Sequence, residues 1–408
     1  MIIYKSVKYN RLANITLLRS ALAAILMLLL PTAASGYDFA VDGIYYNITD
    51  GQAVVTNNGS TGCYSGDVVI PHDVTYQGST YPVTAIGRSA FMLSSLTHIT
   101  LPNTITSIGD NAFAKCSNLA DIDLPSSLKD IGSYAFTMCD RFISVTIPDS
   151  VTTIADYAFY ACTGLKTLTI GPSVTSIGNN AFRALFELNT LIWNAKRCST
   201  TGSMDTYSVS SVEIGDDVEL IPDYFLNGSK VTSVIVPNSV FTIGDSAFYS
   251  CSSLKSVTLG SGIANIGKSI FYGCNQMVEL TCLASSPPSF IDTEFGLFKE
   301  LDDYARVTLH VLPASVEAYQ SAVIWMNFTQ ILGDVTTENL PGDVNGDGDI
   351  TIADANKVIE VIINGGGSSG GHNHAPTREG KSINADLNSD GEVNIGDLNA
   401  IIEYILNH

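Results

Sequence analysis

The 408-residue sequence predicts a right-handed solenoid of stacked repeats with a parallel β-sheet along one face, followed by a small all-α module. Two observations predict this fold. A motif of about 23 residues recurs through the centre of the chain, and two acidic twelve-residue segments recur near its end. Because 45% of the residues are apolar and only 15% are charged, the chain can fill a large core.

The N-terminal segment has the composition of an export signal. Its first 20 residues contain four basic residues and no acid, and an apolar stretch then ends at Pro31. That stretch of about eleven residues is too short to span a bilayer, and the small residues Ala34 and Gly36 follow it. We therefore predict a cleavable signal peptide over residues 1–36 and no transmembrane span. A retained N-terminal anchor is the alternative.

The charge of the chain restricts its partners. It carries 20 basic against 40 acidic residues, a formal net charge of −20. Such a surface repels polyanions, so nucleic acid is not expected as a partner.

Phenylalanine marks the repeat. The strings SIGDNAFAKCSNL and DIGSYAFTMCDRF are copies of one motif, and its phenylalanines are 22 or 23 residues apart except for one gap of 43. They are Phe91, Phe113, Phe136, Phe159, Phe182, Phe225, Phe248 and Phe271. The apolar residues that end the intervening strands keep steps of 21 to 23 from Leu101 to Cys282, so the gap contains one degenerate copy.

Each copy reads as one strand, one turn and one short helical turn. Ile122 and Leu124 alternate with two aspartates as a half-buried strand requires, and Gly132 permits the turn. The short helical turn is carried by Ala135, Phe136 and Cys139. One copy cannot bury its apolar side alone, whereas stacked copies share a continuous core, which predicts a solenoid over residues 83–283.

The unit L-x-x-I-x-L-P-x-x-L-x-x-I-G-x-x-A-F-x-x-C resembles the BspA-like leucine-rich repeats of bacterial surface proteins. The resemblance implies a leucine-rich-repeat solenoid, a secreted or cell-surface location on a bacterium, and adhesion to other proteins. This sequence lacks the asparagine that follows the strand in the better-known eukaryotic repeat, so ligand sites of those relatives are not transferred.

The segments that flank the repeats read as caps. Residues 37–82 contain the hairpin signals Asp42-Gly43 and Asn58-Gly59, which predict an N-terminal β cap. Residues 284–335 contain the strand-like ARVTLHVLP and a short helix from Ser315 to Ala322, which predict a C-terminal cap. Residues 336–342 read as a linker.

The eight cysteines do not form an evident disulfide pattern, although the protein is predicted to be exported. Five share one repeat position, three residues after the phenylalanine: Cys116, Cys139, Cys162, Cys251 and Cys274. Leu185 takes that position in another copy, which favours small buried thiols over disulfides. Since no C-x-x-C pair occurs, a structural zinc site is not expected.

The outward positions of the predicted strands carry mainly hydroxyl and acidic side chains. They are His98, Thr100, Asp121, Asp123, Ser144, Thr146, Thr167, Thr169, Ser211, Glu213, Ser256, Thr258, Glu279 and Thr281. We interpret this surface as a binding face for an extracellular protein or a glycan. Alternatively, Ser and Thr are simply tolerated on a solvated strand. Trp193, the nearest candidate for a sugar-binding ring, falls in a core position.

Two acidic segments fit a twelve-residue calcium loop, with oxygen ligands at positions 1, 3 and 5, glycine at 6, a backbone carbonyl at 7 and a carboxylate at 12. The first, DVNGDGDITIAD, supplies Asp343, Asn345, Asp347, Asp349, Thr351 and Asp354. The second, DLNSDGEVNIGD, supplies Asp386, Asn388, Asp390, Glu392, Asn394 and Asp397. The sequence therefore predicts two Ca²⁺ sites; an acidic solvated turn is the alternative.

Each loop runs into an apolar stripe with helical spacing, and no helix precedes it. Duplicated loop-then-helix units with Asp at position 12 resemble type I dockerin modules, over residues 343–408. The resemblance implies calcium-dependent binding of a cohesin-type partner. Positions 10 and 11, where cellulosomal dockerins contact that partner, are Ile352, Ala353, Ile395 and Gly396. These are apolar or bare rather than hydroxylic, so a cohesin of different specificity and docking against the solenoid both stay open.

Catalysis has little support in the sequence. The six histidines form no nucleophile-and-base pattern, and neither G-x-S-x-G nor H-E-x-x-H occurs. We predict a non-catalytic extracellular binding or adhesion protein whose solenoid recognises a protein or glycan and whose tail docks to a cohesin-type partner. The alternative is an accessory subunit of a polysaccharide-degrading, cellulosome-like assembly.

Overall fold

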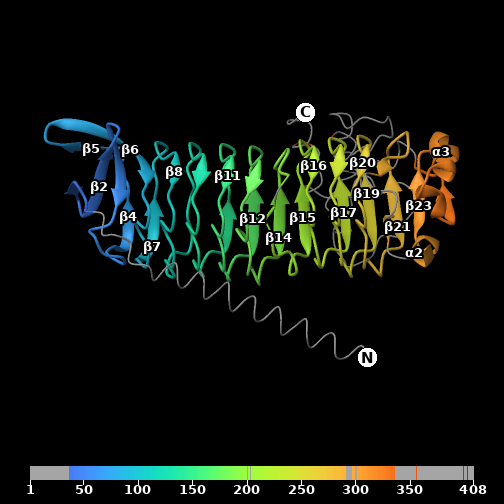
Figure 1. Cartoon of the computed structure of the whole chain (residues 1–408), viewed down its shortest axis with the longest axis horizontal. Helices are drawn as coiled ribbons and strands as arrows, with labels where there is room; N and C mark the ends of the chain where they lie inside the picture. Colours follow the sequence, from blue (N-terminus) through green and yellow to red (C-terminus); the bar gives the residue numbers. More distant parts are fainter. Residues whose placement is uncertain are drawn as a thin grey trace, which may run out of the picture.

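The fold is a long solenoid with a β cap at its N-terminal end and a mixed cap at its C-terminal end (Figure 1). The computed structural model describes residues 36–199, 201–202, 204–290, 296–298 and 301–335, together with Ala355, Leu398 and Ile402. Within these residues the predicted solenoid with a parallel sheet along one face is confirmed. The predicted signal peptide, apart from Gly36, lies outside the described residues.

Antiparallel hairpins build the N-terminal end. Strands β1 (Phe39–Val41), β2 (Ile44–Thr49) and β3 (Gln52–Thr56) pair in sequence, and the predicted turn at Asp42-Gly43 joins the first two with positive φ at both residues (50° and 79°). Two further hairpins use the same turn chemistry and were not predicted: Asp50-Gly51 joins β2 to β3, and Gln77-Gly78 joins β5 (Asp73–Tyr76) to β6 (Ser79–Ile86).

The predicted hairpin at Asn58-Gly59 is wrong. The strand that follows it, β4 (Ser65–Val69), pairs in parallel with β7 (Ser95–Thr100) rather than with β3. The asparagine side chains hold a loop instead, because Asn57 Oδ1 accepts the Gly59 N–H at 2.9 Å and Asn58 Oδ1 accepts the Ser60 N–H at 3.1 Å.

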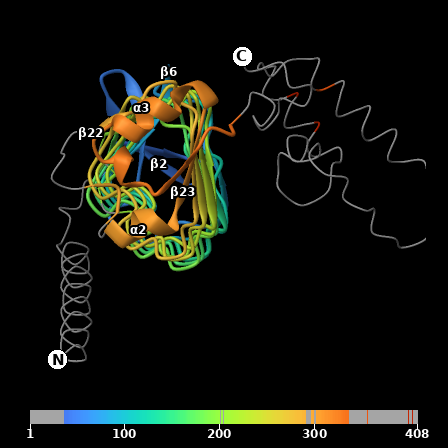
Figure 2. The ribbon, with the colours of Figure 1, turned by 90° about the vertical axis from the view of Figure 1, so that its right-hand side faces the viewer.

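Two parallel strand ladders run along the solenoid, one on each side of a shared core (Figure 2). The ladder of longer strands forms the open face and consists of β10 (Ser144–Thr146), β12 (Thr167–Ile170), β14 (Thr190–Trp193), β15 (Ser211–Ile214), β17 (Ser233–Val236), β19 (Ser256–Leu259) and β21 (Glu279–Cys282). The second ladder continues from β5 (Asp73–Tyr76) and β6 (Ser79–Ile86) through two-residue strands: β8 (Ser107–Ile108), β9 (Asp130–Ile131), β11 (Thr153–Ile154), β13 (Ser176–Ile177), β16 (Leu220–Ile221), β18 (Thr242–Ile243), β20 (Asn265–Ile266) and β22 (Ser289–Phe290).

The segment predicted as a short helical turn has a different hydrogen-bond pattern. Ala112 donates within its own turn to the Gly109 carbonyl at 3.2 Å, whereas Phe113 donates to the Ala135 carbonyl of the next copy at 2.7 Å. Alternate N–H groups therefore serve the turn and the neighbouring copy, and Asn111 takes a positive φ of 56° to allow this. Within the described part of residues 83–290 the structure contains no helix.

Stacked phenylalanine rings form the centre of the core. Ring centroids of Phe91, Phe113, Phe136, Phe159 and Phe182 follow one another at 5.0, 5.1, 4.9 and 5.3 Å with interplanar angles below 15°. All five side chains are fully buried. The period of the motif therefore sets the period of the core, as the sequence predicts.

The position predicted for Phe225 is wrong by one residue. Leu226 takes the phenylalanine position of its copy, because its carbonyl accepts the Cys251 thiol just as the Phe113 carbonyl accepts Cys139. Phe225 occupies the preceding, alanine position, and its ring packs edge-on against Trp193 at 5.2 Å. The larger ring fits there because the preceding degenerate copy supplies no stacked phenylalanine.

The degenerate copy coincides with breaks in both ladders of the described structure. The second ladder has no strand between β13 and β16, and the open-face sheet is divided between β15 and β17. The open-face sheet is also divided between β7 and β10, where the strand predicted around Ile122 and Leu124 is not formed. Where most copies have cysteine, three consecutive copies here have Leu185, Thr206 and Ser229. The core remains continuous through the interruption, since Trp193 and Cys198 are both buried.

A mixed cap closes the C-terminal end. It contains α2 (Leu301–Arg306), β23 (Thr308–Val311), α3 (Val316–Ser321) and β24 (Gln330–Leu332), and the two strands extend the open-face sheet in parallel. The strand and the short helix predicted there are present. Two 3₁₀ turns, η1 (Pro313–Ser315) and η2 (Trp325–Asn327), flank α3, and Trp325 donates its indole N–H to the Pro288 carbonyl at 2.9 Å.

Candidate functional site

Two columns of side chains cover the open face. Residues in equivalent positions of neighbouring copies lie side by side: Ser144 pairs with Thr167, which pairs with Thr190, which pairs with Ser211. The second column runs in the same way through Thr146 and Thr169 to Ile192 and Glu213. All the outward residues predicted from the strand pattern are exposed or half-buried. The face also includes Ile235, which is 54% exposed and was not predicted.

The N-terminal end of the open face is acidic. His98 Nδ1 lies 3.2 Å from an oxygen of Asp121, and Thr97 donates its hydroxyl to Asp67 at 2.7 Å. Both partners of the His98–Asp121 pair are exposed to solvent, at 46% and 72% of their side chains, so the pair contributes little to stability. Asp123 is exposed beside them. This end of the face can therefore accept hydrogen bonds from a ligand or bind a positively charged group.

The opposite end of the face is closed by the cap. His310 Nδ1 lies 2.9 Å from Asp334, and the Thr308 hydroxyl lies 3.1 Å from the Gln330 side-chain oxygen. These contacts join β23 to β24 and to Asp334, which follows β24. Between these two ends the face carries mainly hydroxyl side chains, with Ile192, Glu213 and Ile235 among them.

Exposed aromatic rings lie at the edge of this face, and the sequence reading missed them. Trp193 is fully buried, as predicted, and its indole N–H has no hydrogen-bond partner among the described residues. Phe186 and Tyr207, by contrast, are 64% and 58% exposed in the loops before β14 and β15. Comparing loop positions between copies, and not only strand positions, would have found them.

Three buried thiols that share one repeat position, those of Cys116, Cys139 and Cys162, are unsuited to nucleophilic chemistry. None of the eight cysteines, all of them within the described residues, forms a disulfide, and seven of them are buried. Cys116, Cys139 and Cys162 donate their thiol protons to carbonyls of the preceding copy at 3.0–3.2 Å. Burial raises the pKa of Cys116 and Cys162 to about 12, and it raises the pKa of Cys139 as well. These groups stay protonated at neutral pH and are not nucleophiles.

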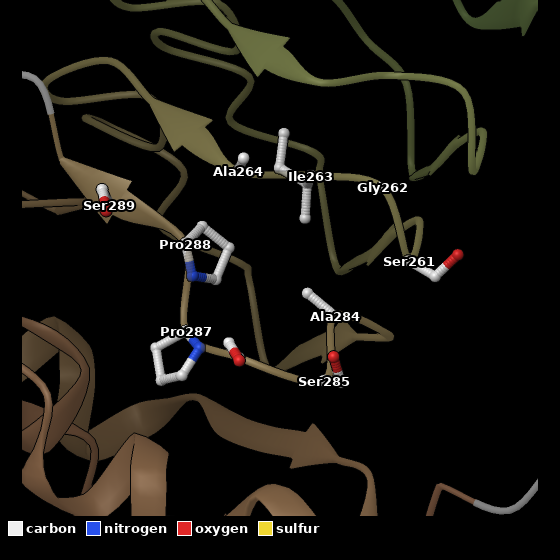
Figure 3. A pocket seen from close by; sticks show the side chains of 10 residues that line it. Ser261, Gly262, Ile263, Ala264, Ala284, Ser285, Pro287, Pro288 and Ser289 are labelled. Atoms are coloured by element: carbon white, nitrogen blue, oxygen red, sulfur yellow. The ribbon is translucent and has the colours of Figure 1, made fainter.

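A shallow pocket of about 340 Å³ lies between the loops of the last repeat copies (Figure 3). Small and apolar residues line it, among them Ser261, Ile263, Ala284, Pro287 and Pro288. Its lining contains no charged side chain. The pocket therefore lacks an acid, a base and a metal ligand.

Models of protein families match two separate parts of the chain. A BspA type leucine-rich repeat region, in six copies, matches residues 84–203 and 203–286, and a dockerin type I domain matches residues 341–406. The chain is a BspA-type leucine-rich-repeat protein with a dockerin tail. Leucine-rich-repeat and dockerin families are generally non-catalytic and typical of extracellular or surface proteins.

The dockerin tail implies calcium and a cohesin partner, because type I dockerins generally bind both. The twelve predicted calcium ligands, from Asp343 to Asp397, lie outside the described residues, as do the predicted partner contacts Ile352, Ala353, Ile395 and Gly396. In the part that the structure describes, no group of three or more His, Cys, Asp or Glu residues is arranged to hold a metal ion.

Solved bacterial leucine-rich-repeat structures are similar to this BspA-type protein. One from Bacteroides ovatus is 26% identical, with a TM-score of 0.42, over 68% of this chain and 77% of that chain. The leucine-rich-repeat protein of T. pallidum is 22% identical, with a TM-score of 0.37, over 59% of this chain and 90% of that chain. No curated protein matches the chain. Among the described helices, none is long and apolar enough to cross a membrane.

Proposed function

We propose that this protein is an extracellular binding protein in which the solenoid recognises a ligand and the dockerin tail attaches the solenoid to a cohesin-bearing partner. The dockerin type I match over residues 341–406 carries the second half of this proposal. The open face supports the first half, because the outward side chains predicted from its strand pattern are all exposed or half-buried. Repeat solenoids commonly bind partners on such extended surfaces.

The tail is proposed to bind two calcium ions. Each predicted loop provides carboxylate and amide oxygens at the spacing that Ca²⁺ requires, with Asp354 and Asp397 closing the two sites. Metal binding and folding are coupled in small modules of this kind, so calcium controls whether the docking surface forms.

Calcium-dependent capture tests this function. The full secreted chain is passed over an immobilised panel of cohesin modules, first with Ca²⁺ and then with a chelator. We expect retention by at least one cohesin in calcium and release by the chelator. The paired variant Asp343→Asn/Asp386→Asn serves as the loss-of-calcium control. Retention that persists in the chelator, or no retention by any cohesin, would refute the proposal that the tail docks to a cohesin in a calcium-dependent way.

A second candidate function is that of an accessory subunit of an extracellular polysaccharide-degrading assembly. The same dockerin match favours it, since a cohesin scaffold can place this solenoid beside hydrolases. Native complexes purified through the cohesin partner separate the two functions: co-purification of glycoside hydrolases supports the accessory role, and their absence supports an adhesive one.

A further inference from the structure

One position of the repeat departs from its pattern in two adjacent copies. The residue that follows the cysteine position faces solvent just before each strand of the open-face sheet. In most copies it is polar, as in Ser117, Asp140, Thr163, Lys230, Ser252 and Asn275. In two consecutive copies it is Phe186 and Tyr207, exposed by 64% and 58%. We call these two residues the aromatic pair.

The hydrogen bonds place the aromatic pair at equivalent points of neighbouring turns. Leu188 N–H donates to the Leu185 carbonyl, and Val209 N–H donates to the Thr206 carbonyl in the same way. The Ser208 hydroxyl donates to the Phe186 carbonyl at 2.7 Å, which joins the two loops directly. Since neighbouring strands in a sheet are about 4.8 Å apart, the two rings leave the backbone at almost that spacing.

Tyr207 is held in place from beneath. A Cβ added at Gly228 would lie 2.6 Å from Cδ1 and 2.8 Å from Cε1 of the Tyr207 ring. The ring therefore rests on the bare Gly228 backbone of the next copy, while more than half of the side chain stays open to solvent. A ring fixed before binding loses little conformational freedom when a ligand covers it.

Amide and hydroxyl groups border the aromatic pair at the start of β14 and β15. Asn189 Nδ2 donates to the Ser210 hydroxyl at 2.8 Å, and the Thr190 hydroxyl donates to Asn189 Oδ1 at 3.2 Å. These side chains are exposed or half-buried and keep further donor and acceptor capacity. The adjoining charges, Glu187 and Lys230, are opposite in sign, so the surroundings are close to neutral.

We propose that the aromatic pair, with Asn189 and Ser210, binds a neutral carbohydrate chain. A sugar ring has C–H groups that pack on an aromatic face and hydroxyl groups that bond to amides and hydroxyls, and this surface supplies both. A protein ligand would need about 800 Å² on each partner with an apolar centre. Two rings with polar neighbours form a smaller surface than that. This inference rests on the proposed function and names its ligand class.

The test uses affinity electrophoresis of the full chain in gels that contain a soluble β-glucan, xylan, mannan or starch. We expect at least one polysaccharide to retard the protein. The variant Phe186→Thr/Tyr207→Ser, which installs residue types that other copies carry at this position, should bind at least about tenfold more weakly. Phe186→Tyr keeps the ring and should still bind. The control Phe241→Ala removes a 55% exposed ring beside the other ladder and should bind like the native protein.

Melting curves of all variants establish that each is folded. The inference is overturned if no polysaccharide retards the native chain, or if the double variant is retarded equally. It is also overturned if the double variant loses capture of an extracellular-matrix protein while no polysaccharide binds. Cohesin capture in calcium, measured on the same samples, reports on the proposed function separately: capture without carbohydrate binding refutes only this inference.

Discussion

The ring stack makes a quantitative prediction about stability. Phe113 and Phe182 are both fully buried, but the Phe113 ring stacks on two neighbours, at 5.0 and 5.1 Å, whereas among the described residues Phe182 stacks only on Phe159, at 5.3 Å. Truncating either phenylalanine to alanine should lower the free energy of unfolding by about 3–5 kcal/mol. Because each stacked pair contributes about 0.5–1.5 kcal/mol beyond area burial, Phe113→Ala should cost roughly 1 kcal/mol more than Phe182→Ala.

Urea unfolding measures this difference. The buried indoles of Trp193 and Trp325 report on unfolding by fluorescence, and the control Phe186→Ala, at a 64% exposed ring, should change the free energy of unfolding by less than about 0.5 kcal/mol. Equal losses for Phe113→Ala and Phe182→Ala would refute the reasoning, because the ring contacts would then contribute nothing beyond burial. A loss below about 2 kcal/mol at both sites would contradict the packing itself.

Three further predictions concern the turns, the thiols and the tail. Gly132→Ala should lower the melting temperature, because its Cβ would lie 2.7 Å from the Asp110 backbone nitrogen, whereas Ser133→Ala in the same turn should not. Burial raises the pKa of Cys116 and Cys162 to about 12 from 9.0, so the thiols of the unfolded chain ionise first as the pH rises. The urea concentration at the unfolding midpoint should therefore decrease as the pH is raised from about 9 to about 12. This decrease should be smaller in the variant Cys116→Ala/Cys162→Ala. Asp343→Asn/Asp386→Asn should abolish the calcium-induced gain of circular dichroism and leave the melting of the solenoid unchanged; a solenoid that melts earlier would place the proposed boundary near residue 340 elsewhere.

The fold was predictable because one period controls both the sequence and the core. The spacing of Phe113, Phe136 and Phe159 specifies stacked rings, and the strand pattern specifies which side chains reach solvent. The hydrogen-bond pattern of the turns was not predictable from the spacing of the apolar residues. Apolar residues that are one helical turn apart fit a short helix and a series of consecutive tight turns equally well. A positive φ at positions such as Asn111 distinguishes the series of turns from a helix, and the pattern of side chains does not reveal it.

Some errors arose in regular parts of the fold, at the predicted Asn58-Gly59 hairpin and the predicted short helical turn. The others arose where the period is disturbed. Phe225 and Leu226 are both large and apolar, so the sequence alone does not show which of them enters the phenylalanine position; the Trp193 ring beside Phe225 decides it. The exposed aromatic rings were missed because Phe186 and Tyr207 lie in loops, outside the strand pattern that defines the face. The predicted calcium ligands lie outside the described residues and stay a prediction.

These disturbances lie close together, which has a physical reason. A regular copy must match both neighbours, so each of its positions is restricted to residues that the adjacent copies accept. The three copies with Leu185, Thr206 and Ser229 at the cysteine position are less restricted, because among the described residues the second ladder has no strand between β13 and β16 and the open-face sheet is divided between β15 and β17. Large rings can then occupy a position that is polar elsewhere, and Gly228 leaves room for one of them. A specific site on a repetitive surface needs such an irregularity, because a ligand cannot distinguish identical copies. These irregular copies are therefore where recognition by the solenoid should be concentrated.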